Sequence, residues 1–448
     1  MSGMASAFPA TDPETGRNGF TSLYRTALLL LSSRAVFGLV NLAAAAVAAS
    51  AVGLSAFGAV ILCHAVARLV GDTLRFQSWQ AILGFGTPML DRGEGRSLSR
   101  LIGVTVALDL AALGIALGLL MIFAPALGQA LGWPHEMQDW VRFYALAAVF
   151  MTSATPTGVL RLMDRFDILN WQHAINAVVR LTGATAVLWF GLGLDALFTV
   201  WFAAAVLSGG WMMLRAFMLG RAMLTVLPAT GRTEMPPRFW PFVLSTNLSS
   251  SISGALLHGS TLAVGAVLGP AASALYAIAR QISDALAKPA KLLGPVVMPA
   301  FSETRNDATG GASTLMTRSL VIGGTAMIAI VALVYLAGDA ILAAVFGAEA
   351  LAAHGLLVLA AVAAAITLCG FALEPAILAT GRADLALVLS ISAALAYAAL
   401  LGLLLPAEGL FGAGLALLAH AALLFAGRLA VARWLLHDRV PANHPEAA

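Results

Sequence analysis

Four arginines lie inside long apolar stretches, where a charged side chain needs a specific reason to be present. They are Arg34, Arg68, Arg180 and Arg280. A charge at the centre of a membrane helix costs about 2.5–3.5 kcal/mol on insertion scales, so such residues usually face a cavity or a partner. A guanidinium group stays charged, is weakly hydrated and holds phosphate through paired hydrogen bonds. These arginines, with Asn41 nearby, predict a site for a phosphorylated substrate.

Each of these arginines also has a structural interpretation. Arg34 could pair with Asp109, because buried arginines are commonly paired. Arg68 and Arg280 could extend to the cytoplasmic interface. Asp284, one helical turn after Arg280, could neutralise it. The sequence leaves these alternatives open, since it does not show which helices face one another.

Acidic residues in the apolar stretches are fewer. Asp109 and Glu374 are the candidates for ion coupling, because either could carry a proton or, with carbonyls freed by Pro375, bind Na⁺. Structural pairing or hydrogen bonding is the alternative for both. No cofactor, metal site or catalytic residue is predicted, since the histidines lack metal-ligand spacing and no phosphate-binding loop or hydrolase motif is present.

The overall composition is that of a membrane protein. Of 448 residues, 60% are hydrophobic and 10% are charged, and the mean hydropathy is +0.90. Soluble domains carry about 25% charged residues, so the polar side chains are too few to cover a soluble globule. The net charge of +3 is too small to indicate a nucleic-acid partner, and two cysteines in apolar runs exclude a disulfide framework.

Twelve apolar stretches are long enough to cross a bilayer, which takes about 20 residues of helix. All should be helices, because lipid cannot satisfy an irregular backbone. The sequence therefore predicts an all-α polytopic membrane protein. The approximate spans are 26–48, 54–74, 98–124, 140–160, 172–191, 196–218, 242–263, 270–290, 317–337, 351–373, 384–405 and 409–432.

The basic residues set the expected orientation. When loops are placed on alternate sides of the membrane, nearly all Lys and Arg of the loops fall on one side, and only Arg142 falls on the other. Short cytoplasmic loops retain basic residues, so both termini are expected to be cytoplasmic. The outer loops are too short to form a catalytic domain, which argues against an enzyme.

The longest connection in mid-chain contains four helix breakers, Pro228, Gly231, Pro236 and Pro237. It divides the spans into two sets of six. We expect a disordered cytoplasmic tail at 1–20, an N-lobe with helices 1–6 at 21–220, a cytoplasmic linker at 221–241, a C-lobe with helices 7–12 at 242–434 and a cytoplasmic tail at 435–448.

The two halves share weak sequence similarities at one offset. Arg68 matches Arg280, and residues 165–167 (RFD) match residues 382–384 (RAD). Six spans in each half make the halves parallel repeats, related by an axis normal to the membrane. Such a duplication is typical of transporters with a central cavity between two lobes.

Several stretches resemble those of bacterial polysaccharide exporters, the oligosaccharide and O-antigen flippases of the multidrug, oligosaccharidyl-lipid and polysaccharide exporter superfamily. They lie in both halves of the chain. The stretches are GLSAFG at 53–58, RFQSWQ at 75–80, GVLRLMDRFD at 158–167, LYAIAR at 275–280 and GPVVMP at 294–299.

The resemblance implies two six-helix lobes in a V shape that alternately expose a cationic cavity to each side. It also implies a cargo, an undecaprenyl-pyrophosphate-linked oligosaccharide moved from the inner to the outer leaflet of the bacterial cytoplasmic membrane. Its expected partners are this lipid-linked substrate, membrane lipids, and a polysaccharide polymerase or assembly protein.

Two other transport functions remain open. A cation-coupled multidrug antiporter would need an acid in the first helices, where the sequence has Arg34 instead. A flippase for the lipid-linked peptidoglycan precursor would also use an arginine-lined cavity, although such proteins typically have two further spans. A membrane scaffold without transport activity predicts that Arg34 and Arg180 can be neutralised without loss of function.

Overall fold

The computed structural model describes residues 36–437, except 75, 131–132, 134, 152–153, 232–233, 304–310 and 381. Arg34 lies outside the described residues, so its predicted role is not placed. The described chain is almost entirely helical, with one isolated bridge between Glu94 and Ala229. The all-α fold expected from the sequence is confirmed.

The first half of the chain contains a helix at Val36–Val52, a long α4 and a broken fourth span. In that span α5 and α7 meet at a bend of 48°. The labelled helices are α2 (Leu54–Leu74), α3 (Ser78–Asp91), α4 (Gly95–Ala130), α5 (His135–Ala145), α6 (Ala148–Met151), α7 (Ala154–Leu162), α8 (Phe166–Trp189) and α9 (Leu194–Val226).

The second half repeats this pattern of long antiparallel helices. α15 contains a break at Gly409, where φ is 60°, and His420 Nδ1 lies 3.0 Å from the carbonyl oxygen of Ala393, so the two parts form a hairpin. The elements are α10 (Phe239–Leu268), α11 (Pro270–Glu303), α12 (Gly311–Phe346), the 3₁₀ helix Ala348–Ala353, α13 (His354–Cys369), α14 (Leu373–Ala379) and α15 (Ala383–His437).

Within the described residues, every predicted span coincides with a helix or a broken helix, and residues 26–35 of the first span lie outside them. By length and composition, six of the described helices can cross a membrane, or seven if the bent pair counts as one span. The sequence did not predict α3, which lies in the connection between the second and third spans. Its Ala81 and Met89 pack in a buried cluster with Phe239 at the start of α10, so this connection is a packed helix rather than a loop.

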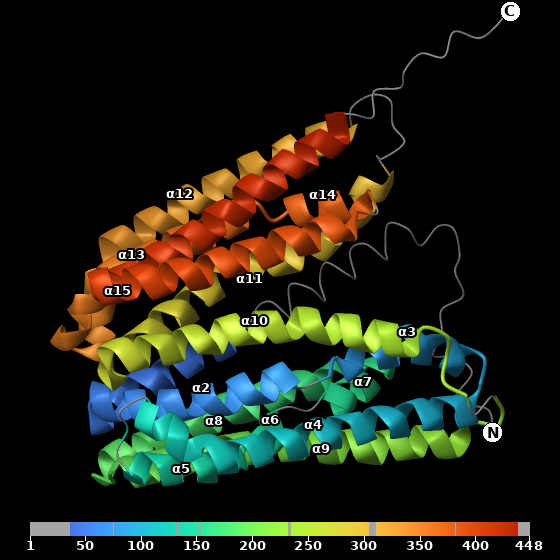
Figure 1. Ribbon diagram of the computed structural model, residues 1–448, viewed down its shortest axis with the longest axis horizontal. Coiled ribbons are helices and arrows are strands. Elements are labelled where there is room, and N and C mark those ends of the chain that lie inside the picture. Colours follow the sequence, from blue (N-terminus) through green and yellow to red (C-terminus); the bar gives the residue numbers. More distant parts are fainter. Residues whose placement is uncertain are drawn as a thin grey trace, which may run out of the picture.

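The helices form two lobes in a V shape (Figure 1). The lobes converge at the end that carries the turns at Gly53 and Gly269 and separate toward the end that carries α3 and α14. Helix α10 belongs to the second repeat, yet it packs along α2 of the first. By the predicted orientation, the closed end is external and the open end is cytoplasmic.

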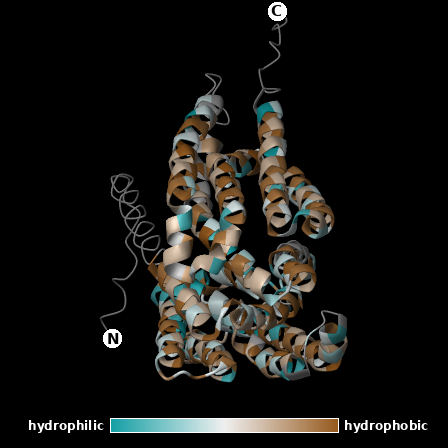
Figure 2. Cartoon of the chain, turned by 90° about the vertical axis from the view of Figure 1, so that its left-hand side faces the viewer, coloured by the Kyte–Doolittle hydropathy of each residue, from teal (hydrophilic) through white to brown (hydrophobic). Residues whose placement is uncertain are grey.

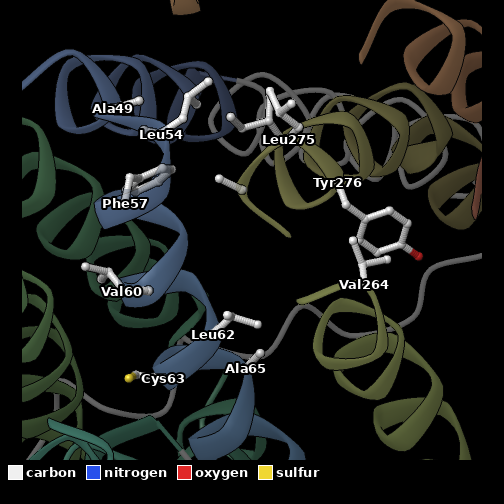
Figure 3. Close-up of a cluster of buried hydrophobic side chains, with 14 of the residues drawn as sticks. Ala49, Leu54, Phe57, Val60, Leu62, Cys63, Ala65, Val264, Leu275 and Tyr276 are labelled. Carbon is white, nitrogen blue, oxygen red and sulfur yellow. The ribbon is translucent and has the colours of Figure 1, made fainter. Parts of the chain in front are cut away.

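The closed end is a tightly packed apolar junction. Figure 3 shows Leu54, Phe57 and Leu62 of α2 in one cluster with Val264 of α10 and Leu275 of α11, and the same residues are buried in the largest core. Glycines allow the helices to approach closely here. A Cβ atom at Gly58 would collide with the backbone carbonyl of Pro270, the first residue of α11. The two lobes are therefore in backbone contact at this end.

The outer faces of both lobes are apolar. Figure 2 shows hydrophobic residues along the long helices of both lobes. Only 17% of the most apolar window of α4 and 11% of that of α12 is buried, against 61% for α2. Large apolar residues on α4 and α12, such as Ile122 and Ile328, are exposed on the surface. Such a surface is unfavourable in water. These two helices therefore face lipid, and α2 lies in the core.

The connection between the lobes, residues 227–238, is tied to the turn between α3 and α4. The backbone N–H of Gly95 donates to the carbonyl of Pro228 at 3.1 Å. The Thr230 hydroxyl donates to the carbonyl of Gly93 at 2.9 Å. The connection is thus fastened to the first lobe before α10 begins.

The repeat-related RFD and RAD motifs form the same structure. Arg165 donates from Nε and Nη2 to the carboxylate of Asp167 at 2.8 and 2.7 Å. Arg382 donates to Asp384 in the same way, at 3.0 Å from both Nε and Nη2. Each acid lies in the first turn of its helix, where the helix dipole favours negative charge. The two halves therefore begin their fifth helices with one shared motif.

These motifs predict an acid-dependent loss of stability. The hydrogen bonds from Arg165 and Arg382 lower the pKa of Asp167 and Asp384 below their ordinary 3.8. A lowered folded-state pKa gives stability that is complete above the ordinary value and is lost as the pH falls below it. The Asp167→Asn/Asp384→Asn double variant should therefore melt earlier than wild type at pH 6, with the difference shrinking as the pH falls below 3.8. Melting curves with the exposed Asp195→Asn as control test this, and a pH-independent difference would contradict it.

Candidate functional site

A cavity of about 620 Å³ lies between the two lobes. We call it the interlobe cavity. Helices α2, α8 and α9 line one side, α10 and α11 line the other, and the helix Val36–Val52 also contributes. Its polar lining consists of Asn41, His64, His173, Asn176, Arg180, His258, Thr261, Arg280, Gln281, Asp284 and Lys288.

Arg180 of α8 reaches this cavity from the first lobe. Its guanidinium carbon lies 5.3 Å from the centre of the Trp201 ring on α9, an arrangement that holds a cation by its attraction to the aromatic face. Among the described residues, the buried Nε atom of Arg180 has no hydrogen-bond partner. The side chain is therefore positioned and retains an N–H that can bind an anion.

Arg280 of α11 reaches the same cavity from the second lobe. Its Nη1 donates to the hydroxyl of Ser260 on α10 at 3.1 Å. Its guanidinium lies 6.0 Å from the ring of Tyr276, and the Tyr276 hydroxyl is 2.7 Å from that of Tyr397. Neutral groups thus orient Arg280 without cancelling its charge.

The remaining charges of the interlobe cavity lie along α11. Asp284 is one helical turn after Arg280, and Lys288 is one turn further. Counting Arg180, the described lining residues include three cations and one carboxylate. The cavity therefore favours an anion, and cations of both lobes can reach it together.

A second cavity of about 450 Å³ lies within the first lobe, and we call it the N-lobe cavity. It shares His64, Arg180 and His258 with the interlobe cavity. Arg68 and Arg161 also line it. The guanidinium of Arg161 lies 4.2 Å from the ring centre of Trp79. Of the predicted arginines, Arg180 and Arg280 thus share one cavity with Asn41, while Arg68 lines the adjoining one.

Sequence reasoning did not predict Lys288 and Arg161 as lining residues of the two cavities, and it missed Asp72, an acid that contacts the lining of both. Asp72 is buried on α2 and accepts from Arg68 Nη2 at 3.1 Å. The same oxygen, Oδ2, lies 3.2 Å from Nε2 of His258 on α10. The i, i+4 spacing of His64, Arg68 and Asp72 was a usable signal for one polar helix face. The pairing with His258, 186 positions away, needed the tertiary fold.

The two acids predicted to couple transport to an ion lie away from both cavities. Asp109 of α4 accepts from the Ser78 hydroxyl at 2.6 Å and from the backbone N–H of Thr155 at 2.7 Å. It thereby binds the first turn of α7. Glu374 at the start of α14 lies 2.9 Å from Arg428 Nη2 on α15. Both have structural partners, as the alternative interpretation anticipated, and ion coupling through them stays a prediction.

Replacing Asp109 should destabilise the first lobe. In Asp109→Ala the Ser78 hydroxyl and the Thr155 N–H lose a charged acceptor, and each hydrogen bond to a charged group contributes about 1.5–3 kcal/mol. We expect a loss of roughly 3 kcal/mol of unfolding free energy, measured by denaturation of the purified protein. The exposed Asp195→Ala is the control. Unchanged stability together with lost ion dependence of transport would instead assign Asp109 to coupling.

Comparisons with known proteins also indicate a membrane protein. Inner membrane protein YghQ of Escherichia coli (strain K12) is 29% identical over 345 residues, which cover 75% of this chain and 96% of YghQ. No protein-family model matches the chain.

Solved structures share the fold at low sequence identity. An inward-facing multidrug resistance MATE family transporter of the MOP superfamily has a TM-score of 0.71 at 13% identity, covering 90% of this chain and 95% of that one. Lipid II flippase MurJ in an inward closed conformation has 0.64 at 13% identity, over 90% and 87%. An outward-facing MATE transporter has 0.57 at 14% identity, over 93% and 95%. The chain is thus a membrane protein with the two-lobe fold found in MATE transporters and the flippase MurJ.

Proposed function

We propose that this protein is a flippase that moves a polyprenyl-pyrophosphate-linked oligosaccharide from the inner to the outer leaflet of a bacterial inner membrane. The observation that carries the proposal is the interlobe cavity, where Arg180 of one lobe and Arg280 of the other line one space. A pyrophosphate group offers the oxygens that two guanidinium groups bind best. Because the arginines belong to different lobes, a movement of the lobes changes the distance between the two guanidinium groups and thereby the affinity for the cargo.

The remaining lining suits the other parts of this cargo. Asn41, Asn176 and Gln281 supply amide groups that can bind sugar hydroxyls. The polyprenyl tail stays in lipid beside the cavity, since a long apolar chain gains nothing by leaving the hydrocarbon. Such a cargo belongs to surface polysaccharide assembly, for O-antigen, capsule or exopolysaccharide, so a polysaccharide polymerase or assembly protein is the expected partner downstream.

The V shape fits a cytoplasm-facing state of the transport cycle. The open end carries the basic loops, and similarity is higher to the inward-facing MATE structure than to the outward-facing one, with TM-scores of 0.71 and 0.57. In this state the cargo enters from the inner leaflet, where it is synthesised.

Two neighbouring functions have specific support. A lipid-linked peptidoglycan precursor is an alternative cargo, since one structural neighbour is a lipid II flippase. A cation-coupled drug antiporter is supported by the MATE neighbours. Against the antiporter, no Asp or Glu occurs in the helix Val36–Val52, and a drug cation would meet the excess positive charge of the cavity.

The proposal is tested by transfer of a fluorescent undecaprenyl-pyrophosphate oligosaccharide between leaflets of proteoliposomes. Wild type should accelerate transfer over empty vesicles. Arg142 lines neither of the two cavities and is paired with Asp139 at 3.3 Å. Arg142→Gln should therefore retain the wild-type transfer rate. Transfer of lipid II alone would move the protein to peptidoglycan synthesis. Exchange of an organic cation for H⁺ or Na⁺, without lipid transfer, would establish the antiporter.

A further inference from the structure

The junction between α2 and α10 contains a buried acid held by two basic side chains. Asp72 is 6% exposed. Its Oδ2 lies 3.1 Å from Arg68 on its own helix and 3.2 Å from His258 on α10. Next to it the Ser251 hydroxyl donates to the carbonyl of Thr73 at 2.5 Å, so the two helices are tied at this level.

Arg68 binds this acid and also lines the N-lobe cavity. Its Nη2 binds Asp72 and its Nη1 donates to the Met151 carbonyl at 3.2 Å. The side chain is 28% exposed and lines the cavity, whereas that of Asp72 is 9% exposed. An anion in the N-lobe cavity can therefore reach Arg68 but not Asp72. Such an anion competes directly with Asp72 for the guanidinium.

His258, the other basic contact of Asp72, can substitute for Arg68. The charged groups that act on His258 are Arg68, Asp72 and Arg280, and those that act on neighbouring His64 are Arg68, Arg180 and His258. Tyr144 of α5 hydrogen-bonds His64 at 2.9 Å and is neutral. Among the described residues that line the N-lobe cavity, no acid is present. When Arg68 turns to an anion, His258 is the contact of Asp72 that can take up a compensating positive charge.

We propose that Asp72 and His258 form a proton-binding site that is filled when Arg68 binds the phosphate groups of the cargo. A proton from water in the cavity adds to the imidazole of His258, or is shared with the carboxylate, and no other bond changes. This inference rests on the proposed anionic cargo. It makes anion binding and proton uptake reciprocal, so each strengthens the other.

A proton fits this site better than Na⁺. Sodium needs several oxygen ligands, whereas Arg68 and His258 present nitrogen donors from basic side chains to Asp72 Oδ2. Both cavities share the His258 side chain, which gives protons a path from water. The site also lies at the contact between α2 of the first repeat and α10, the first helix of the second. A change in its charge therefore acts on the contact between the two halves.

The test is calorimetric titration of the purified full-length protein with farnesyl-diphospho-N-acetylglucosamine. This pyrophosphate diester keeps two fixed charges between pH 5 and 8. Titrations in buffers of different ionisation enthalpy give the number of protons taken up. Wild type should take up as much as about one proton per bound ligand, and its affinity should rise as the pH falls, by up to about tenfold per unit. Asp72→Asn should bind without proton uptake, and its affinity at pH 8 should match that of wild type at low pH.

A matched control exists in the second lobe. Asp339 and His354 form another Asp–His contact, with Oδ1 and Nδ1 2.6 Å apart, and neither residue lines the two cavities described above. Asp339→Asn should therefore keep wild-type proton uptake. If Asp72→Asn does not fold, His258→Gln gives the same test, because it keeps a donor near Asp72 but cannot be protonated.

The outcomes separate this inference from the proposed function. Binding with unchanged proton uptake in Asp72→Asn and His258→Gln would overturn the proton site and leave the flippase proposal standing. Binding that depends on Na⁺ at constant pH would also overturn it. Failure of wild type to bind the diester at any pH, with binding of organic cations instead, would overturn both.

Discussion

Transfer of the lipid-linked oligosaccharide should fall at least about 30-fold in Arg180→Gln and in Arg280→Gln. Removing one partner of a desolvated charge pair usually costs 2–5 kcal/mol, and about 1.4 kcal/mol is a factor of ten. Among the described residues, the buried Nε of Arg180 has no hydrogen-bond partner, and Arg280 is oriented by neutral hydroxyl and aromatic groups. Neither arginine has a described ion pair to lose, so substitution removes charge from the cavity rather than from the core.

The double variant and a lysine series sharpen this result. Arg180 and Arg280 would hold one pyrophosphate, so their effects should not add fully, and the loss of activity in the double variant should be smaller than the product of the two single losses. Arg180→Lys should recover only part of the activity, since a lysine cannot form paired hydrogen bonds to phosphate. Transfer is measured as dye accessibility in the outer leaflet, with Arg142→Gln as control. Wild-type rates in the double variant would eliminate the anion-binding role of the cavity.

In the proposed flippase, Gly58→Ala should shift the population from the cytoplasm-facing state toward the externally open one. The new methyl group would meet the backbone carbonyl of Pro270, which cannot rotate away as a side chain can. Overpacking of this kind costs about 1–3 kcal/mol, here only in the state that closes the external end. The population of the externally open state should therefore rise roughly 5- to 150-fold.

Cysteine accessibility measures this shift. A Cys63→Ala/Cys369→Ala background carries one probe, Ala277→Cys, which lines the interlobe cavity. A membrane-impermeant maleimide added outside should label this probe faster in Gly58→Ala. Gly114→Ala is the matched control, because a Cβ atom there has open space around it. Equal labelling in both glycine variants would show that the Gly58 contact does not close the external gate.

The sequence predicted the helices well because membrane helices depend on local composition. Twenty apolar residues must form a helix in lipid wherever the rest of the chain lies. The ion pairs of the RFD and RAD motifs join residues only two positions apart, so they depend on local sequence alone. The similarity between the two motifs is therefore also found in the structure. Helix α3 was missed, since it lies in a connection and its partner, Phe239, is distant in sequence, and most of α14 lies beyond the predicted span 351–373.

The site was only partly predictable because it depends on which sides of the helices pack toward one another. The cost of burying charge identified Arg180 and Arg280 as residues needing a cavity, but not that they share it with Asn41. Asp72 escaped notice because its position near the end of an apolar stretch resembles an interface. Its role is defined by His258, a residue that has no special spacing in the sequence.

The tie between the interlobe connection and the turn before α4 determines which parts move together. Because Thr230 and Pro228 are bonded to the first lobe, and α10 is joined to α2 by Ser251 and His258, α10 is mechanically part of the half to which it does not belong by sequence. In the proposed cycle we therefore expect α11 to α15 to move as a unit, with Gly269, the residue between α10 and α11, as its pivot. We expect the long proline-rich connection to transmit no motion. Proteolytic cleavage within it should therefore leave the cycle intact, whereas stiffening the short turn would stop it.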